Sequence, residues 1–139
     1  MKQQLQAVTG ILMDLMTPPV PSLGIDLDGC VDEAPIFFQL LTNYWPGKVF
    51  VLTYRSDRTK AIADLVQFNI KYDELILVDS FDAKAQMIKE IGIQIYFDDQ
   101  PEMLKNVSPD VNVMLVRNGG NFDFDDKLWM LSQQTGRLI

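Results

Sequence analysis

The sequence of 139 residues contains no histidine and only one cysteine, Cys30. The missing histidine excludes serine–histidine and cysteine–histidine catalysis and a histidine-ligated zinc, and a single cysteine excludes a four-cysteine zinc site. A chain that cannot form an intrachain disulfide suits the cytoplasm, which is the predicted location. Any reaction or metal site must therefore use carboxylates, hydroxyls, lysine or arginine, and such oxygen-rich sites select Mg²⁺ or a similar hard cation.

Positive charge and long apolar runs are also scarce. The chain has 12 lysines and arginines against 19 aspartates and glutamates, with a formal net charge of −7. This acidic balance argues against nucleic acid or an anionic membrane surface as the main partner. No run approaches the roughly 20 apolar residues that span a membrane. We therefore expect neither a nucleic-acid partner nor a membrane partner.

The chain divides into a leader and one domain. In residues 1–21, apolar residues recur at helical spacing and are followed by Pro18, Pro19 and Pro21, which break the chain. This leader is expected to be either helical and packed on the domain, or disordered. Residues 22–139 contain no internal repeat and no linker, which predicts a single domain.

Short apolar runs alternate with helical patterns along this domain. The runs expected to form strands are Leu23–Ile25, Lys48–Leu52, Leu75–Val78, Gln94–Phe97 and Val111–Val116. Three amphipathic helices are marked by Phe37, Leu40, Leu41 and Tyr44, by Ile62, Leu65 and Val66, and by Met87, Ile88 and Ile91. Strands separated by helices predict a parallel, doubly wound α/β sheet.

Most of the expected strands end on or next to a polar side chain. The residues at these ends are Asp26, Thr53, Asp79 and the pair Asp98 and Asp99. Aspartate and threonine commonly end strands and cap helices, which is one interpretation. Ligands of parallel sheets, however, bind at the carboxyl ends of the strands, where the strand order reverses. Asp26 and Asp28, two residues apart on an extended segment, are expected to point the same way, and the repeated pattern favours a site.

Lys84 places a positive charge near these acids. It lies near the start of the third expected helix, after Asp82 as the expected cap, on the apolar stripe that Met87, Ile88 and Ile91 continue. A lysine in that position either extends to solvent or points at negative groups in the crevice. The carboxylates at the strand ends favour the second orientation.

Four segments, GIDLDGC, VFVLTYR, Lys84 and IYFDDQPEML, resemble in this order the four motifs of the haloacid dehalogenase superfamily. The resemblance covers residues 22–105. It implies a Rossmann-like three-layer α/β sandwich whose five-stranded parallel sheet has the spatial order 3-2-1-4-5. It also implies a cytoplasmic, Mg²⁺-dependent phosphohydrolase that cleaves a phosphomonoester, with a nucleotidase-like activity among the expectations, through an aspartyl-phosphate.

The same resemblance implies a role for each motif residue. Asp26 would be the nucleophile, Asp28 the general acid and base, and Thr53 and Lys84 the phosphate-binding residues. Mg²⁺ would bind Asp26, the backbone carbonyl of Asp28, and Asp98. Asp99 would bind the metal through water or orient its ligands.

The sequence also departs from the family pattern. Cys30 stands where threonine or valine is usual, and we expect a small buried residue there, with a reactive thiol as the alternative. The short intervals between the motifs leave no room for a cap domain. A capless member is implied, which acts on a small phosphorylated substrate or takes a lid from a neighbouring subunit of a homo-oligomer.

The sequence allows more than one interpretation of Arg55, of residues 118–126 and of the function. Arg55 is expected either at the substrate rim or on an exposed loop, and residues 118–126 form either a turn with a helix cap or part of the rim. A receiver-like signalling module also combines acids, threonine and lysine on such a sheet. A catalytically idle Mg²⁺-binding module is the other alternative to the phosphohydrolase.

Overall fold

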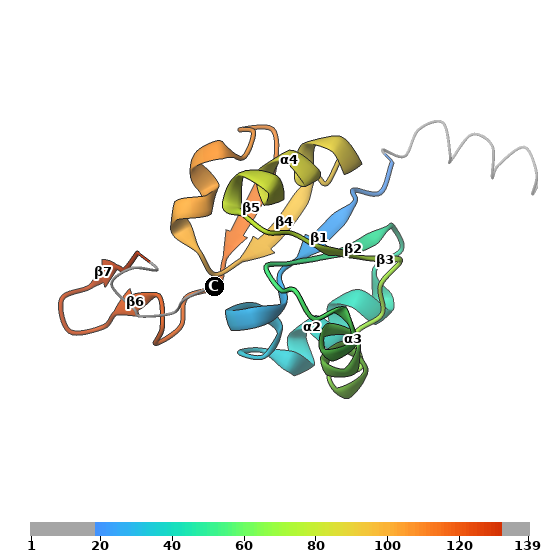
Figure 1. Ribbon diagram of the computed structural model, residues 1–139, viewed down its shortest axis with the longest axis horizontal. Coiled ribbons are helices and arrows are strands. Elements are labelled where there is room, and N and C mark those ends of the chain that lie inside the picture. Colours follow the sequence, from blue (N-terminus) through green and yellow to red (C-terminus); the bar gives the residue numbers. More distant parts are fainter. Residues whose placement is uncertain (1–18, 132–139) are drawn as a thin grey trace, which may run out of the picture.

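A parallel sheet of five strands forms the centre of the computed structural model, which describes residues 19–131 (Figure 1). The strands are β1 (Leu23–Ile25), β2 (Val49–Thr53), β3 (Glu74–Leu77), β4 (Ile95–Asp98) and β5 (Asn112–Leu115). They pair in parallel in the order β3-β2-β1-β4-β5. The predicted sheet and its strand order are confirmed, whereas the predictions for residues 1–18 of the leader lie outside the described residues.

Helices cover both faces of this sheet and complete the predicted three layers. Helices α2 (Pro35–Tyr44) and α3 (Arg58–Gln67) lie on one face, and α4 (Phe81–Ile91) and the 3-10 helix η2 (Pro101–Asn106) on the other (Figure 1). A short antiparallel hairpin of β6 (Phe122–Asp123) and β7 (Leu128–Trp129) follows β5 and projects from the sheet. Within the described part of the chain, no helix is long and apolar enough to cross a membrane.

Apolar side chains pack on both faces of the central strands. Ile25, Val51 and Phe38 belong to the cluster under α2 and α3. Leu52 and Ile88 belong to the cluster under α4. Neighbours such as Val51 and Leu52 enter opposite clusters because successive side chains of a strand point to opposite faces. Burial on both faces explains why the strands appear in the sequence as continuous apolar runs rather than alternating ones.

Helix α2 exists as predicted but buries a different face. Phe37 and Leu40 are half exposed and Tyr44 is 80% exposed, whereas Phe38 and Thr42 are buried. Apolar residues lie on more than one side of this helix, so helical spacing alone did not select the side that meets the sheet. Helical spacing also did not select the buried side of α3, where Leu65 is buried and Val66 is exposed. In α4 the predicted stripe is correct, since Lys84 and Ile88 are both buried.

Candidate functional site

Residues from three adjacent strands meet at the carboxyl edge of the sheet. Asp26 follows β1 directly, Thr53 is the last residue of β2, and Asp98 is the last residue of β4. Since β1 lies between β2 and β4, these ends are neighbours. The order of connections reverses between β1 and β4, which is where ligands of parallel sheets bind.

Three buried carboxylates, those of Asp26, Asp98 and Asp99, form a cluster at this edge. Each offers one oxygen atom, and these oxygens lie within 4.8 Å of one another. The three residues are 5%, 0% and 2% exposed. The structure thus brings Asp26 and Asp98 together as predicted. It also brings a carboxylate oxygen of Asp99 to the same point, where the sequence suggested a supporting role.

Lys84 lies within this acid cluster. Its Nζ donates a hydrogen bond to Asp98 Oδ2 at 2.7 Å and lies 3.1 Å from Asp26 Oδ1. The residue is 2% exposed, so it points at the acids and does not extend to solvent. The expected cap at Asp82 is wrong: the cap is Ser80, two residues earlier, whose backbone is extended and whose hydroxyl accepts a hydrogen bond from the Ala83 N–H.

Two carboxylates of the acid cluster share one lysine. When Asp26 and Asp98 are both ionised, Lys84 balances the charge of only one of them. Burial raises the pKa of Asp26 well above its usual range, against the effect of Lys84, and the nearby Asp98 and Asp99 add to the rise. Burial disfavours the charge on Lys84, but Asp26 and Asp98 outweigh it and raise the pKa of the lysine. Burial and the neighbouring carboxylates therefore favour the protonated form of Asp26.

Tyr96 supports Asp98, a contact that the sequence did not reveal. The buried Tyr96 hydroxyl donates to Asp98 Oδ2 at 2.6 Å, and the Gln100 N–H donates to Asp98 Oδ1 at 2.8 Å. Tyr96 precedes Asp98 by two residues on β4, so both side chains lie on the same face of the sheet. That spacing was the available signal.

Thr53 has a buried hydroxyl without a partner. The residue is 0% exposed. Among the side chains that the structure describes, its Oγ1 is the one buried polar atom that makes no hydrogen bond. A buried hydroxyl left in this state costs roughly 1–3 kcal/mol, and native proteins rarely leave one without a function. This orphaned hydroxyl stands at the end of β2, the strand next to β1, and is a donor that a ligand could use.

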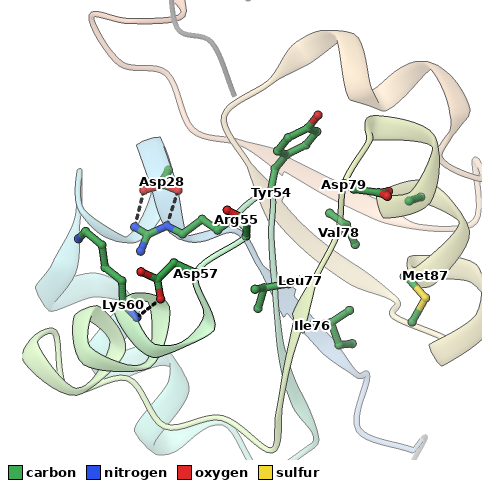
Figure 2. A pocket seen from close by; sticks show the side chains of 12 residues that line it. Asp28, Tyr54, Arg55, Asp57, Lys60, Ile76, Leu77, Val78, Asp79 and Met87 are labelled. Atoms are coloured by element: carbon green, nitrogen blue, oxygen red, sulfur yellow. Dashed lines mark hydrogen bonds and ion pairs between the residues drawn. The ribbon is translucent and has the colours of Figure 1, made fainter.

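Asp28 turns away from the acid cluster, which corrects the prediction that it points the same way as Asp26. The extended strand ends at Ile25, and the segment η1 (Leu27–Val31) is irregular, with Gly29 at φ 74°. Only glycine adopts this conformation without strain. The Asp28 carboxylate is 58% exposed and pairs with Arg55 (Figure 2).

Arg55 is fixed by two carboxylates. Its Nε and Nη2 donate to the two oxygens of Asp28 at 2.8 and 2.6 Å, and its Nη1 donates to Asp64 Oδ2 at 2.6 Å. The side chain is only 17% exposed, so the alternative of a solvent-exposed loop arginine is wrong. The hydrogen bonds that Arg55 donates to Asp28 raise the pKa of the guanidinium, although burial opposes this.

The segment 118–126 contributes two buried asparagines that hold the loops around the site. Asn118 Nδ2 donates to the carbonyl of Gly29 at 2.9 Å. Asn121 Nδ2 donates to the carbonyls of Asp99 and Val116 at 2.6 and 2.7 Å. The segment was expected to be a turn or a rim. These contacts instead join the loops that follow β1, β4 and β5.

Two other predicted positions have plain outcomes. Cys30 is fully buried, and burial followed by the negative charge of Asp26 raises the pKa of its thiol, which agrees with a small core residue and not with a reactive thiolate. Asp79 follows β3 but is exposed and does not reach the acid cluster. The outer position of β3 in the sheet keeps its end away from the end of β1.

Comparison with known proteins shows the fold and little else. No family model matches the chain, and no curated protein matches it. Among solved structures, the chain is similar to a universal stress protein in complex with cAMP, with a TM-score of 0.50 and 10% sequence identity. The match covers 70% of this chain and 98% of that chain. At this identity the likeness establishes a shared α/β fold.

The identification with the haloacid dehalogenase superfamily is therefore wrong, and the prediction of a phosphatase of that type falls with it. Acidic, hydroxyl and lysine side chains at strand ends are compatible with several families, because one α/β architecture supports unrelated functions. The roles of Asp26 as nucleophile and of Asp28 as general acid and base rested on that identification and lose their support with it.

Proposed function

We propose that this protein is a binding module that holds a phosphorylated small molecule together with Mg²⁺ at the carboxyl edge of β1, β2 and β4. One observation carries the proposal. Within a cluster of three buried carboxylates, Asp26 and Asp98 share a single lysine, and the orphaned Thr53 hydroxyl lies on the neighbouring strand. A divalent cation balances the remaining charge, and a phosphate supplies an acceptor for the hydroxyl.

The donor atoms of the acid cluster suit a hard cation. All three are carboxylate oxygens, which Mg²⁺ prefers. On Asp98, Oδ2 accepts from both Lys84 and Tyr96, whereas Oδ1 accepts only the Gln100 N–H. On Asp26, the contacts with the Leu27 N–H and with Lys84 both use Oδ1. Asp26 Oδ2, Asp98 Oδ1 and Asp99 would hold the cation, which when bound supplies a positive charge for an anionic ligand.

The phosphate would be held by this chain's own residues beside the cation. Lys84 already interacts with Asp26 and Asp98, so it does not by itself make the edge attractive to an anion. Phosphate binding should therefore depend on the cation. The Thr53 hydroxyl would donate to a phosphate oxygen and so lose its buried, unpaired state. The likeness in fold to a protein solved with cAMP, itself a phosphate ester, adds support by analogy alone.

The test separates the cation from the phosphate. Metal-free protein is titrated with Mg²⁺ by calorimetry, and inorganic phosphate binding is followed by ³¹P NMR with and without Mg²⁺. Asp99→Asn should weaken Mg²⁺ binding at least tenfold, a loss of about 1.4 kcal/mol. Thr53→Val should weaken phosphate binding and leave Mg²⁺ binding unchanged. Asp110→Asn is the matched control, since Asp110 is exposed and precedes β5 at the opposite edge of the sheet.

Two outcomes would overturn the proposal. One is the absence of saturable Mg²⁺ binding in the millimolar range, and the other is phosphate binding that is equal with and without Mg²⁺. We also infer a cytoplasmic location, because the one cysteine, Cys30, is a free and buried thiol. A homo-oligomer that covers the site is a further proposal, which sedimentation with and without Mg²⁺ would test.

A further inference from the structure

A pocket of about 960 Å³ lies at the carboxyl ends of β2 and β3, on the same edge of the sheet as the acid cluster (Figure 2). Its walls come from the loop after β2, from β3, and from the first turns of α4. Small-molecule sites typically measure roughly 300–1,000 Å³. A phosphate group alone would leave most of this space empty, so the pocket suits a larger ligand.

The pocket begins one residue away from the proposed phosphate site. Tyr54, which lines the pocket, directly follows Thr53, and Ala83, which also lines it, directly precedes Lys84. Consecutive Cα atoms are about 3.8 Å apart. These chain neighbours place the pocket close to the proposed phosphate site, although Thr53 and Lys84 do not themselves line it.

The side chains of the pocket favour an apolar, flat group. Ile76, Leu77 and Met87 supply apolar contacts along one part of the wall. Tyr54 supplies an aromatic ring, and this ring packs edge-to-face on Phe81 at 6.0 Å between centroids, which holds it in place. Methionine and tyrosine side chains both form favourable contacts with aromatic rings.

Carboxylates outnumber basic groups among the charged side chains of the pocket. Arg55 uses its donors on Asp28 and Asp64, and Lys60 lies 3.1 Å from Asp64. Asp57 and Asp79 also line the pocket and disfavour a second anionic group of the ligand there. The pocket therefore selects for ring contacts and not for additional negative charge.

We propose that this pocket binds the planar aromatic part of the phosphate ester, so that the ligand is an aromatic phosphate such as a nucleoside monophosphate. This inference rests on the proposed function and assigns its ligand class. Stacking of a nucleobase on an aromatic side chain is worth about 1–3 kcal/mol, or roughly 5- to 150-fold in affinity. The part of the affinity that depends on Tyr54 should therefore be easy to measure.

The experiment compares three probes in the presence of Mg²⁺ by calorimetry: AMP, ribose 5-phosphate and inorganic phosphate. AMP should bind at least about fivefold more tightly than ribose 5-phosphate. Tyr54→Ala should remove this advantage of AMP without weakening the binding of inorganic phosphate. Tyr54→Phe keeps the ring and should retain the advantage of AMP. Tyr44→Ala is the matched control, because Tyr44 is 80% exposed on α2.

The outcomes distinguish this inference from the function on which it rests. If inorganic phosphate binds with Mg²⁺ but AMP and ribose 5-phosphate bind equally, the aromatic pocket is wrong and the proposed function stands. If Tyr54→Ala weakens all three probes alike, the residue supports the fold of the loop and the inference is overturned. If no probe binds in the presence of Mg²⁺, the proposed function fails and the inference fails with it.

Discussion

Replacing Lys84 with methionine removes the positive charge that the buried carboxylates of Asp26 and Asp98 share. Methionine keeps most of the length and volume of the side chain, so a cavity contributes little. The substitution removes the hydrogen bond to Asp98 at 2.7 Å and the ion pair with Asp26 at 3.1 Å. Removing one partner of a buried ion pair costs roughly 3–5 kcal/mol, because the other charge is left without compensation.

The size of this effect should depend on pH and on Mg²⁺. A domain of this length loses about 3–5 °C in Tm for each kcal/mol, so Lys84→Met should melt roughly 10–20 °C below the wild type in chelator. Without Lys84 the pKa of Asp26 rises further, because the lysine lowers it in the wild type, and a proton then relieves the repulsion. The loss should therefore be largest near about pH 8 and smaller near about pH 5.

Urea unfolding followed by far-UV circular dichroism measures the effect, first in chelator and then with Mg²⁺. The matched control is Lys89→Met in the last turn of the same helix, where the side chain is exposed and the expected loss is under about 1 kcal/mol. Mg²⁺ should restore more stability to Lys84→Met than to the wild type. If both variants lose the same small amount in chelator, the argument from buried charge is refuted.

Two further predictions concern the acid cluster and the loop that supports it. Burial raises the pKa of Asp26 in the folded protein. The folded protein therefore keeps a proton that the unfolded chain releases above about pH 4. The metal-free wild type should lose stability as the pH rises through the pKa of the folded state. Asp26→Asn cannot ionise, and its unfolding free energy relative to the wild type should increase between about pH 4.5 and about pH 8; a constant difference would contradict this. Asn121→Ala removes hydrogen bonds to the carbonyls of Asp99 and Val116. Urea unfolding should show a loss of roughly 2–4 kcal/mol in unfolding free energy, and Mg²⁺ should bind more weakly. The control Asn106→Ala, at an exposed asparagine, should show neither effect. Unchanged Mg²⁺ affinity in Asn121→Ala would show that this loop does not position Asp99.

The positions of the strands and the ends at which the site forms were predictable from the sequence. Strands buried on both faces appear as short apolar runs, and Asp26, Thr53 and Asp98 follow three of these runs directly. Parallel strands bring their carboxyl ends to one edge, so local sequence is enough to place these residues together. The orientation of Lys84 was also predictable, because its place on the apolar stripe of α4 is a property of helical spacing alone.

The pairing of side chains at that edge was decided only by tertiary structure. The Asp28 carboxylate meets Arg55, 27 positions along the chain, because Gly29 turns the backbone after β1. Asn118 and Gly29 meet across 89 positions. No local preference encodes such contacts, since they depend on how loops from different strands end up side by side.

The sequence did not correctly predict which face of α2 is buried, and it did not correctly identify the family. Apolar residues lie on two sides of α2, and only packing on the sheet left Phe37 exposed and Phe38 buried. Short polar motifs at strand ends, in turn, follow from what any parallel sheet requires at its ligand-binding edge, so they indicate where a ligand binds and not which chemistry follows.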